Sequence, residues 1–211
     1  MRKILLISLL MLAACAPAAT PAPTLPVIIS IHASALTQSW LPKAYDCAQK
    51  FQLILSDVND PAQADISIRI GEPVPPESSA YQIGQDDVLI LTNPENPLQN
   101  LTLEQVRAVF SDPGKQSVQV WVFAPGEDLQ QVFSREVMQD TAITSLANLA
   151  LSPQQMLDAL NKDKNAIGLL PRHLKNETLH EIFNIPAVPV LALTTSEPKD
   201  AVKKLLGCLQ H

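Results

Sequence analysis

From about residue 27 onward, short apolar runs alternate with amphipathic helical patterns, and this alternation limits the possible folds more than any other feature. Runs rich in Ile, Val and Leu predict strands at 27–31, 52–56, 65–70, 88–92, 117–123, 166–170 and 188–194. Between the strands, apolar residues at three-to-four spacing predict helices that begin near residues 40, 102, 127, 152 and 196. Strands that alternate with helices form βαβ units. The sequence therefore predicts an α/β fold with mostly parallel sheets and flanking helices.

The first fifteen residues, MRKILLISLLMLAAC, have the pattern of an export signal. Arg2 and Lys3 precede an apolar core that is too short to span a bilayer, and small residues follow it. LAAC, at positions 12–15, resembles the bacterial lipobox, in which the cysteine becomes the first residue and carries acyl chains. We therefore predict a signal peptide at 1–14 and lipidation of Cys15. The alternative is an ordinary secretory signal that is cut near the alanines.

Residues 15–26 join this cysteine to the rest of the chain. APAATPAPTLP carries no charge and is rich in Ala and Pro, so it cannot build a core and favours an extended form. We predict a tether that holds the body off the membrane. Two acyl chains anchor a protein firmly, since each buried methylene contributes about 0.8 kcal/mol. The predicted location is the outer, extracytoplasmic side of a bacterial cell envelope membrane.

Two further cysteines, Cys47 and Cys208, remain in a compartment that is predicted to be oxidising. They could form a disulfide. The other interpretation is two separate buried thiols, because sequence spacing does not show that the two side chains meet.

Composition and motif content argue against several functional classes. The formal net charge is −6 and no Lys/Arg cluster stands out, whereas nucleic-acid binding normally needs a basic surface. No Ser-His-Asp set, nucleotide-binding loop or paired-carboxylate motif is evident, so we predict no enzyme. The four histidines lack the spacing of metal ligands. We therefore predict neither a metal nor a cofactor.

The segment YQIGQDDVLILTNPENPLQNLTLEQVRAVFSD, residues 81–112, resembles the phosphate-type substrate-binding proteins of ABC importers. These proteins have a related strand between lobes, an Asn-Pro pair, NLTLEQ and a helix that ends in FS. The order of the other predicted elements agrees in outline over the whole body. The resemblance implies a divergent, lipid-anchored member with the two-lobed periplasmic-binding-protein-like fold and a cleft between the lobes.

The same resemblance implies a division of the body into lobes. Lobe 1 would combine residues 27–92 with 171–211, and lobe 2 would be 93–170. Crossings near 88–92 and 168–171 would form a hinge around which the lobes close on a ligand. The implied partners are a small polar solute in the cleft and an ABC permease.

Proteins of this family bind their oxyanion through three sequence features, and this chain matches the first two poorly. The first is a polar loop after the first strand, where Ser34 and Thr37 match in HASALTQ. These residues would serve equally well as helix N-caps. The second is a Gly/Ser-rich loop and helix between the next two strands. This chain has only DVNDPAQA, residues 57–64, between these strands, so the resemblance implies no ligand-binding donor in this connection.

The third feature is the signature GSGTR at the start of a second-lobe helix. Aligned on Phe133, it corresponds to Gly126, Glu127, Asp128, Leu129 and Gln130, so only the first glycine is kept. A helix N-terminus offers an anion about 0.3–1 kcal/mol. A carboxylate about 5 Å from a phosphate costs about 3 kcal/mol at an effective dielectric near 20. The arginine fork is also lost. We therefore expect that phosphate is not the ligand.

Glu127 and Asp128 have two interpretations. Acids in the first turn stabilise their own helix by complementing its dipole. Alternatively, one of them faces the cleft and binds a cation, an amine or a polyol. Arg69, on the predicted strand 65–70, is expected on the solvent face rather than in the cleft.

Two functional classes remain after these arguments. In the first, the chain is a lipid-anchored solute-binding protein of an importer, with candidate ligand-binding residues Ser34, Thr37, Gly126, Glu127, Asp128 and Gln130. In the second, the fold serves as an envelope scaffold or a protein-interaction module. The predicted lobes and hinge favour the first class, whereas the eroded oxyanion features favour the second.

Overall fold

The computed structural model describes residues 26–73, 79–115, 117–139 and 141–211. The predicted signal peptide 1–14, the predicted lipidation site Cys15 and the tether up to residue 25 lie outside the described residues. No helix in the described ranges is long and apolar enough to cross a membrane.

The described residues form one eight-stranded sheet with the order β2-β1-β3-β8-β4-β7-β5-β6. The strands are β1 (Ile28–Ala33), β2 (Ile54–Asp57), β3 (Ile66–Ile70), β4 (Ala80–Thr92), β5 (Gln119–Val122), β6 (Asn148–Leu149), β7 (Ala166–Pro171) and β8 (His180–Leu193). The pairs at both ends of this order are parallel, and the pairs that involve β4 or β8 are antiparallel. The predicted α/β class is confirmed.

Helices flank the sheet along its length. They are α1 (Leu41–Lys50), α2 (Leu103–Ser111), α3 (Asp128–Phe133), α4 (Pro153–Lys162) and α5 (Asp200–Leu209). A π-helical turn, Ser134–Met138, continues α3. Short 3-10 turns cover Gln38–Trp40, Pro61–Gln63, Pro113–Lys115 and Arg172–Leu174.

Local signals explain where the helices begin. A capping box begins α2, as expected for a helix that starts near residue 102, because Thr102 Oγ1 accepts from the Gln105 backbone and Gln105 Oε1 accepts from the Thr102 backbone. Ser152 caps α4 in the same way by accepting from the backbone of Gln155 at 3.1 Å. The last helix begins later than the predicted start near residue 196, because α5 starts at Asp200 with Lys199 at its N-cap.

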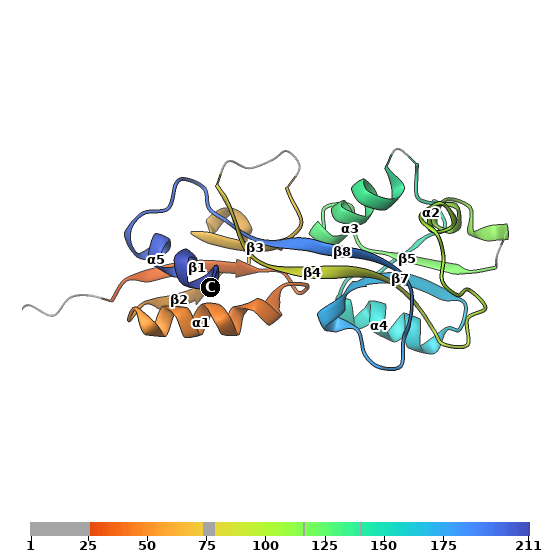
Figure 1. Ribbon diagram of the computed structural model, residues 1–211, viewed down its shortest axis with the longest axis horizontal. Coiled ribbons are helices and arrows are strands. Elements are labelled where there is room, and N and C mark those ends of the chain that lie inside the picture. The colour runs from red at the N-terminus through yellow and green to blue at the C-terminus, as the bar shows by residue number, and fades with distance from the viewer. Residues whose placement is uncertain (1–25, 74–78, 116, 140) are drawn as a thin grey trace, which may run out of the picture.

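Two long strands join the two ends of the molecule (Figure 1). β1, β2, β3, α1 and α5 form a first group, and β5, β6, β7, α2, α3 and α4 form a second group. β4 and β8 pass through both groups and pair with each other from Ala80↔Leu193 to Thr92↔His180. Residues 168–171, predicted as the second crossing, belong to β7 and pair with β4 inside the second group.

The beginning of β8 lies against the second group. The Leu101 backbone donates to the carbonyl of Ile182 at 2.9 Å, and Thr178 Oγ1 donates to Asn161 Oδ1 at 2.6 Å. Where lobe 1 ends and lobe 2 begins along β4 and β8 stays a prediction.

A continuous hydrophobic core runs through both groups. Its largest fully buried side chains include Phe110 and Phe133, whose ring centroids lie 4.6 Å apart, and Ile29, Ile68 and Leu91. Burial of such side chains contributes about 1.5–3 kcal/mol each. The apolar periodicity read from the sequence identifies these faces because it reflects burial directly.

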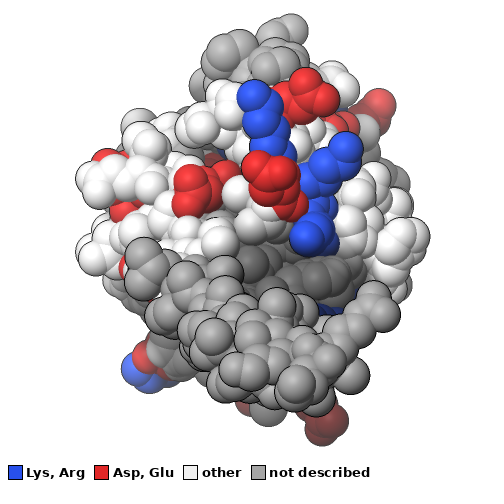
Figure 2. Space-filling view, turned by 90° about the vertical axis from the view of Figure 1, so that its left-hand side faces the viewer, with Lys and Arg blue, Asp and Glu red and all other residues white. Residues whose placement is uncertain are grey.

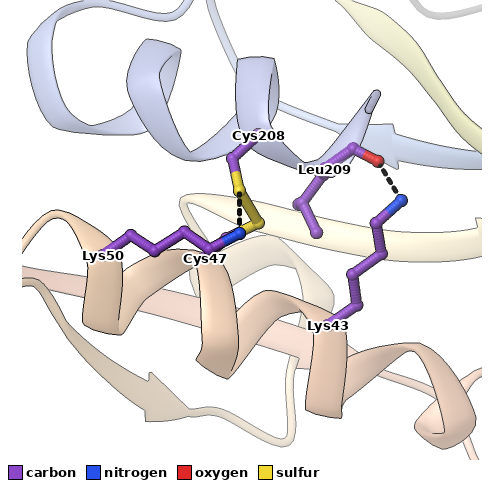
Figure 3. Close-up of a disulfide and its surroundings, with 5 residues drawn as sticks. All are labelled: Lys43, Cys47, Lys50, Cys208 and Leu209. Atoms are coloured by element: carbon purple, nitrogen blue, oxygen red, sulfur yellow. Dashed lines mark hydrogen bonds between the residues drawn. A yellow bond between two sulfur atoms is a disulfide. The ribbon is translucent and has the colours of Figure 1, made fainter.

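A disulfide fastens α5 to α1 (Figure 3). The sulfur atoms of Cys47 and Cys208 lie 2.01 Å apart, and 161 positions separate the two residues in sequence. Lys43 Nζ donates to the carbonyl of Leu209 at 2.7 Å beside the bond. Of the two interpretations left open by the sequence, the structure has the disulfide.

Charged side chains of both signs are mixed on the end of the molecule where α5 and β1 lie. Figure 2 shows basic and acidic groups side by side on the described part of this surface. Neighbouring charges of opposite sign cancel beyond about one Debye length. The described part of this surface therefore presents no extended field of a single sign.

We expect the disulfide to contribute a large share of the stability. Closing a loop of this length restricts the unfolded chain, and loss of such a bond typically costs about 2–5 kcal/mol. Reduction should therefore lower the urea midpoint of the wild-type protein. The double variant Cys47→Ala/Cys208→Ala is the control, since reductant should leave its midpoint unchanged. Equal midpoints for the oxidised and reduced wild type would contradict a stabilising role.

Candidate functional site

A cleft of about 770 Å³ opens between the two groups. Its first-group wall consists of the loop after β1, the connection from β2 to β3, residues 67–69 of β3 and the end of β8. Its second-group wall consists of the loop after β5, the start of α3 and the segment before α4. Ligands of open α/β sheets bind in crevices at the carboxyl ends of strands, and the loops after β1, β5 and β6 and the end of β8 lie there. This cleft is the candidate site.

The loop after β1 places the first pair of predicted residues differently. Ser34 lines the cleft, whereas Thr37 is fully buried and does not line it. Thr37 Oγ1 lies 3.2 Å from the carbonyl of Ile68 and 3.3 Å from Ser34 Oγ, within hydrogen-bond reach of both. Thr37 therefore ties this loop to β3, and Ser34 supplies the hydroxyl at the cleft.

The connection between β2 and β3 is short, as the sequence indicates. It contains a single turn, Pro61–Gln63, capped by Asp60, whose side chain accepts from the backbone of Ala62 at 2.9 Å. Pro61, Ala62 and Ala64 line the cleft here. This wall is therefore largely apolar.

The start of α3 separates the other predicted residues into two sets. Gly126, Glu127 and Asp128 line the cleft. Gln130 does not line it: this side chain is 3% exposed, and its Oε1 accepts from the backbone of Phe123 at 3.1 Å. The amide of Gln130 thus holds the end of β5 against α3.

Asp128 is buried and its carboxylate is bonded on both sides. Oδ2 accepts from the Ile70 backbone at 2.8 Å, and Oδ1 accepts from the Leu129 backbone at 2.7 Å. Burial raises the pKa of Asp128, while these backbone hydrogen bonds and the charge of Arg69 act in the opposite direction. A hydrogen bond to a charged group contributes about 1.5–3 kcal/mol. Asp128 therefore stabilises the start of α3 and also joins α3 to β3.

Glu127 remains available to the cleft. Its carboxylate is exposed and has no hydrogen bond or ion pair with any residue that the structure describes. Partial burial raises the pKa of Glu127, and the negative charge of Asp128 raises it further. Glu127 is thus an acceptor at the cleft surface that a cation or a hydroxyl could use.

The expectation that Arg69 faces solvent is wrong. Arg69 is half-buried and lines the cleft, because its Nη2 donates to Gln131 Oε1 at 2.9 Å and its Nε donates to the carbonyl of Gly71 at 3.1 Å. Arg69 lies on the less buried face of β3, whose residues are partly buried and face the cleft rather than open solvent. The partner on α3 could not be found from the strand pattern.

Sequence reasoning missed most of the hydroxyl and imidazole groups of the cleft. These are His32, Ser67, Ser152, Thr194 and Thr195. They lie on strand ends and connections far apart in sequence, so the available signal was their position next to predicted strand or helix ends. Among the described residues, no group of three or more His, Cys, Asp or Glu side chains could hold a metal ion. The cleft offers hydroxyls, an imidazole and a carboxylate, which suit hydrogen bonding to a polar solute.

Two glycines near this site differ in what they tolerate. A Cβ on Gly71 would lie 2.2 Å from Val132 Cγ2, and Gly71 has a φ of +76°. A Cβ on Gly126 would meet no atom within 4 Å. The close approach of β3 to α3 therefore depends on Gly71, while the turn before α3 does not need a glycine for space.

Comparison with known proteins identifies the fold. No family model matches the sequence, and no curated protein matches it. A putative phosphate ABC transporter substrate-binding protein from Clostridium perfringens, solved with bound phosphate, is similar with a TM-score of 0.71 and 14% identity, over 86% of this chain and 92% of that chain. An ABC-type phosphate transport receptor from Vibrio cholerae has a TM-score of 0.64 and 14% identity, over 87% of this chain and 93% of that chain.

The fold is shared with proteins of another kind. The effector domain of the transcriptional regulator AmpR of Pseudomonas aeruginosa has a TM-score of 0.54 and 16% identity, over 88% of this chain and 94% of that chain. At such identities the likeness concerns the fold. The predicted two-lobed periplasmic-binding-protein-like fold is thereby confirmed.

We expect Gly71→Ala to be far more destabilising than Gly126→Ala. Overpacking costs about 1–3 kcal/mol, and the left-handed backbone of Gly71 adds strain for any other residue. Gly126→Ala should change the unfolding free energy by no more than about 0.5 kcal/mol. Urea unfolding of the two variants measures the difference. Similar values for both would show that β3 and α3 are not packed as described.

Proposed function

We propose that the chain is a lipid-anchored extracytoplasmic protein that binds a small polar solute in its cleft, as part of an ABC importer. The observation that carries this proposal is the unpartnered Glu127 carboxylate beside neutral hydroxyls and an imidazole. In this proposal the chain has no catalytic activity, needs no cofactor or metal and binds no nucleic acid. The proposal keeps the division of the body into lobe 1 (27–92 with 171–211) and lobe 2 (93–170). It also requires a permease as the partner of the chain.

Phosphate is a poor candidate for the solute. Among the described residues that line the cleft, the Lys, Arg, Asp and Glu side chains are Arg69, Glu127 and Asp128, and their formal charges sum to a negative value. The guanidinium of Arg69 already donates to Gln131 and Gly71, and the Asp128 carboxylate accepts from Ile70 and Leu129. Glu127 would face an incoming anion at a cost of about 3 kcal/mol for a 5 Å separation. A neutral polyol or an amine meets no such repulsion.

A second candidate is an envelope scaffold or interaction module. It is favoured by the short β2–β3 connection and by the engagement of Asp128 and Gln130 in the protein itself. In this case the cleft would bind no small solute.

A thermal screen separates the candidates. The purified full chain, unfolded by heating and followed by the fluorescence of Trp40 and Trp121, is mixed with phosphate, sulfate, amines or polyols. A solute at a hundredfold excess over its Kd stabilises the folded state by about 2.7 kcal/mol. We expect a rise in Tm with an amine or polyol and none with phosphate. Glu127→Gln should abolish the rise, with Glu104→Gln, outside the cleft, as the control.

The outcomes of this screen are distinct. A rise in Tm with phosphate would overturn the exclusion of anions. No rise with any compound would favour the scaffold.

Lipid anchoring is tested separately on the full chain expressed in a bacterium. We expect the wild type in the membrane fraction and Cys15→Ala outside it, since the thiol that accepts the acyl chains is lost. Cys47→Ala/Cys208→Ala is the control and should remain with the membrane. Recovery of Cys15→Ala with the membrane to the same extent as the wild type would contradict acylation at this position.

A further inference from the structure

The two groups touch each other at one edge of the cleft, where the end of β3 meets α3. We call this the β3–α3 contact and define it by Arg69, Ile70 and Gly71 on the first group and Asp128, Gln131 and Val132 on the second. Because β3 and α3 are separated by more than fifty residues, this contact is tertiary. It fixes the distance between the two walls.

The polar half of the contact consists of two hydrogen bonds that both run from a donor on β3 to an acceptor on α3. The Ile70 backbone donates to Asp128 Oδ2 at 2.8 Å, and Arg69 Nη2 donates to Gln131 Oε1 at 2.9 Å. Both are charge-assisted, and the first is also buried, which makes it the stronger of the two. A buried backbone N–H that loses its acceptor is costly, so separation of the two walls is opposed.

In the apolar half of the contact, Gly71 and Val132 are packed too closely for a water molecule to lie between them. Val132 is fully buried, and its Cγ2 would lie 2.2 Å from a Cβ on Gly71. Val188 of β8 also lies beside Gly71 at 3.7 Å from the same position. The backbone of the first group at Gly71, the Val132 side chain of the second group and the Val188 side chain of the connecting strand β8 thus meet at one point.

The Asp128 carboxylate does what a bound anion would do in a two-lobed cleft. It comes from one wall and accepts a backbone hydrogen bond from the other, which links the two walls without any solute. We propose that Asp128 is a built-in ligand: its bond to Ile70, together with the Arg69–Gln131 bond, keeps the cleft closed when it is empty. The inference rests on the two-lobe division of the proposed function, but not on any solute.

A built-in carboxylate changes the role that a solute can have. In the empty protein the two walls are already joined, so the binding of a solute would not cause the two groups to close. The protein would present the same closed surface to a partner with and without solute. Opening would require an event that breaks the Asp128–Ile70 bond.

The test is the distance between the two groups in the empty protein. Spin labels at Lys203→Cys on α5 and Gln154→Cys on α4, both exposed positions, report this distance by pulsed EPR while the native disulfide stays intact. The labelled chain without further change should give one narrow distribution. With Asp128→Ala the ratio of open to closed molecules should rise at least about tenfold, because one buried charge-assisted bond is lost.

Matched variants distinguish the effect of losing the Asp128–Ile70 hydrogen bond from the effect of losing a negative charge. Glu127→Ala removes an equal charge one residue away and should leave the distribution narrow. Asp128→Asn keeps one acceptor oxygen for Ile70 and should open the cleft less than Asp128→Ala. Gln131→Ala removes the second bond and should also broaden the distribution. It provides the measurement if Asp128→Ala does not fold.

The inference is overturned by either of two results. One is a broad or long distribution for the chain with Asp128 intact. The other is a distribution for folded Asp128→Ala, or for Gln131→Ala, that is as narrow as that of Glu127→Ala. The thermal screen on the wild type is independent, so a failure to find a solute would affect the proposed function and leave this result unchanged.

Discussion

The antiparallel pairing of β4 with β8 is the interaction on which the rest of the structure depends. Both strands pass through the two groups, so every other strand attaches directly or indirectly to this pair. The register shifts between Asp86 and Val88, near the middle of the pair. There the Asp87 carboxylate accepts from the Ala187 backbone at 2.8 Å and from Arg172 Nε at 2.9 Å. Salt bridges of partly exposed groups are weak individually, but this set fixes the irregular point at which the ladder could otherwise slip.

The sequence predicted the local elements well and their lengths less well. Strands buried on both faces, such as 88–92, are continuous apolar runs and are read directly. The first half of β4, AYQIGQDD, is polar and half-buried, so its extended form depends on pairing with β8. The two-residue strand β6 likewise depends on β5. Pairing partners far along the chain are not visible in local periodicity.

The candidate site was predictable as a place but not as a set of contacts. Gly126 and Glu127 lie in the cleft because the turn before a helix puts them at a strand's carboxyl end. Gln130 points into the protein because α3 turns that face towards Phe123, which only the packing decides. The role of Asp128 depends on the backbone of Ile70, and the sequence pattern of α3 carries no information about that partner.

For a chain that is exported, as we propose, the position of the disulfide has a consequence for the order of events. A chain that crosses a membrane from its N-terminus exposes Cys47 while Cys208, 161 positions later, is still on the other side. Cys47 must therefore stay reduced, or in a mixed disulfide with an oxidant, until α5 has been translocated. Because α1 covers β1 and β2 at the start of the sheet, its attachment becomes permanent only after the last helix has arrived. In the proposed export, covalent completion of the fold therefore follows passage of the whole chain across the membrane.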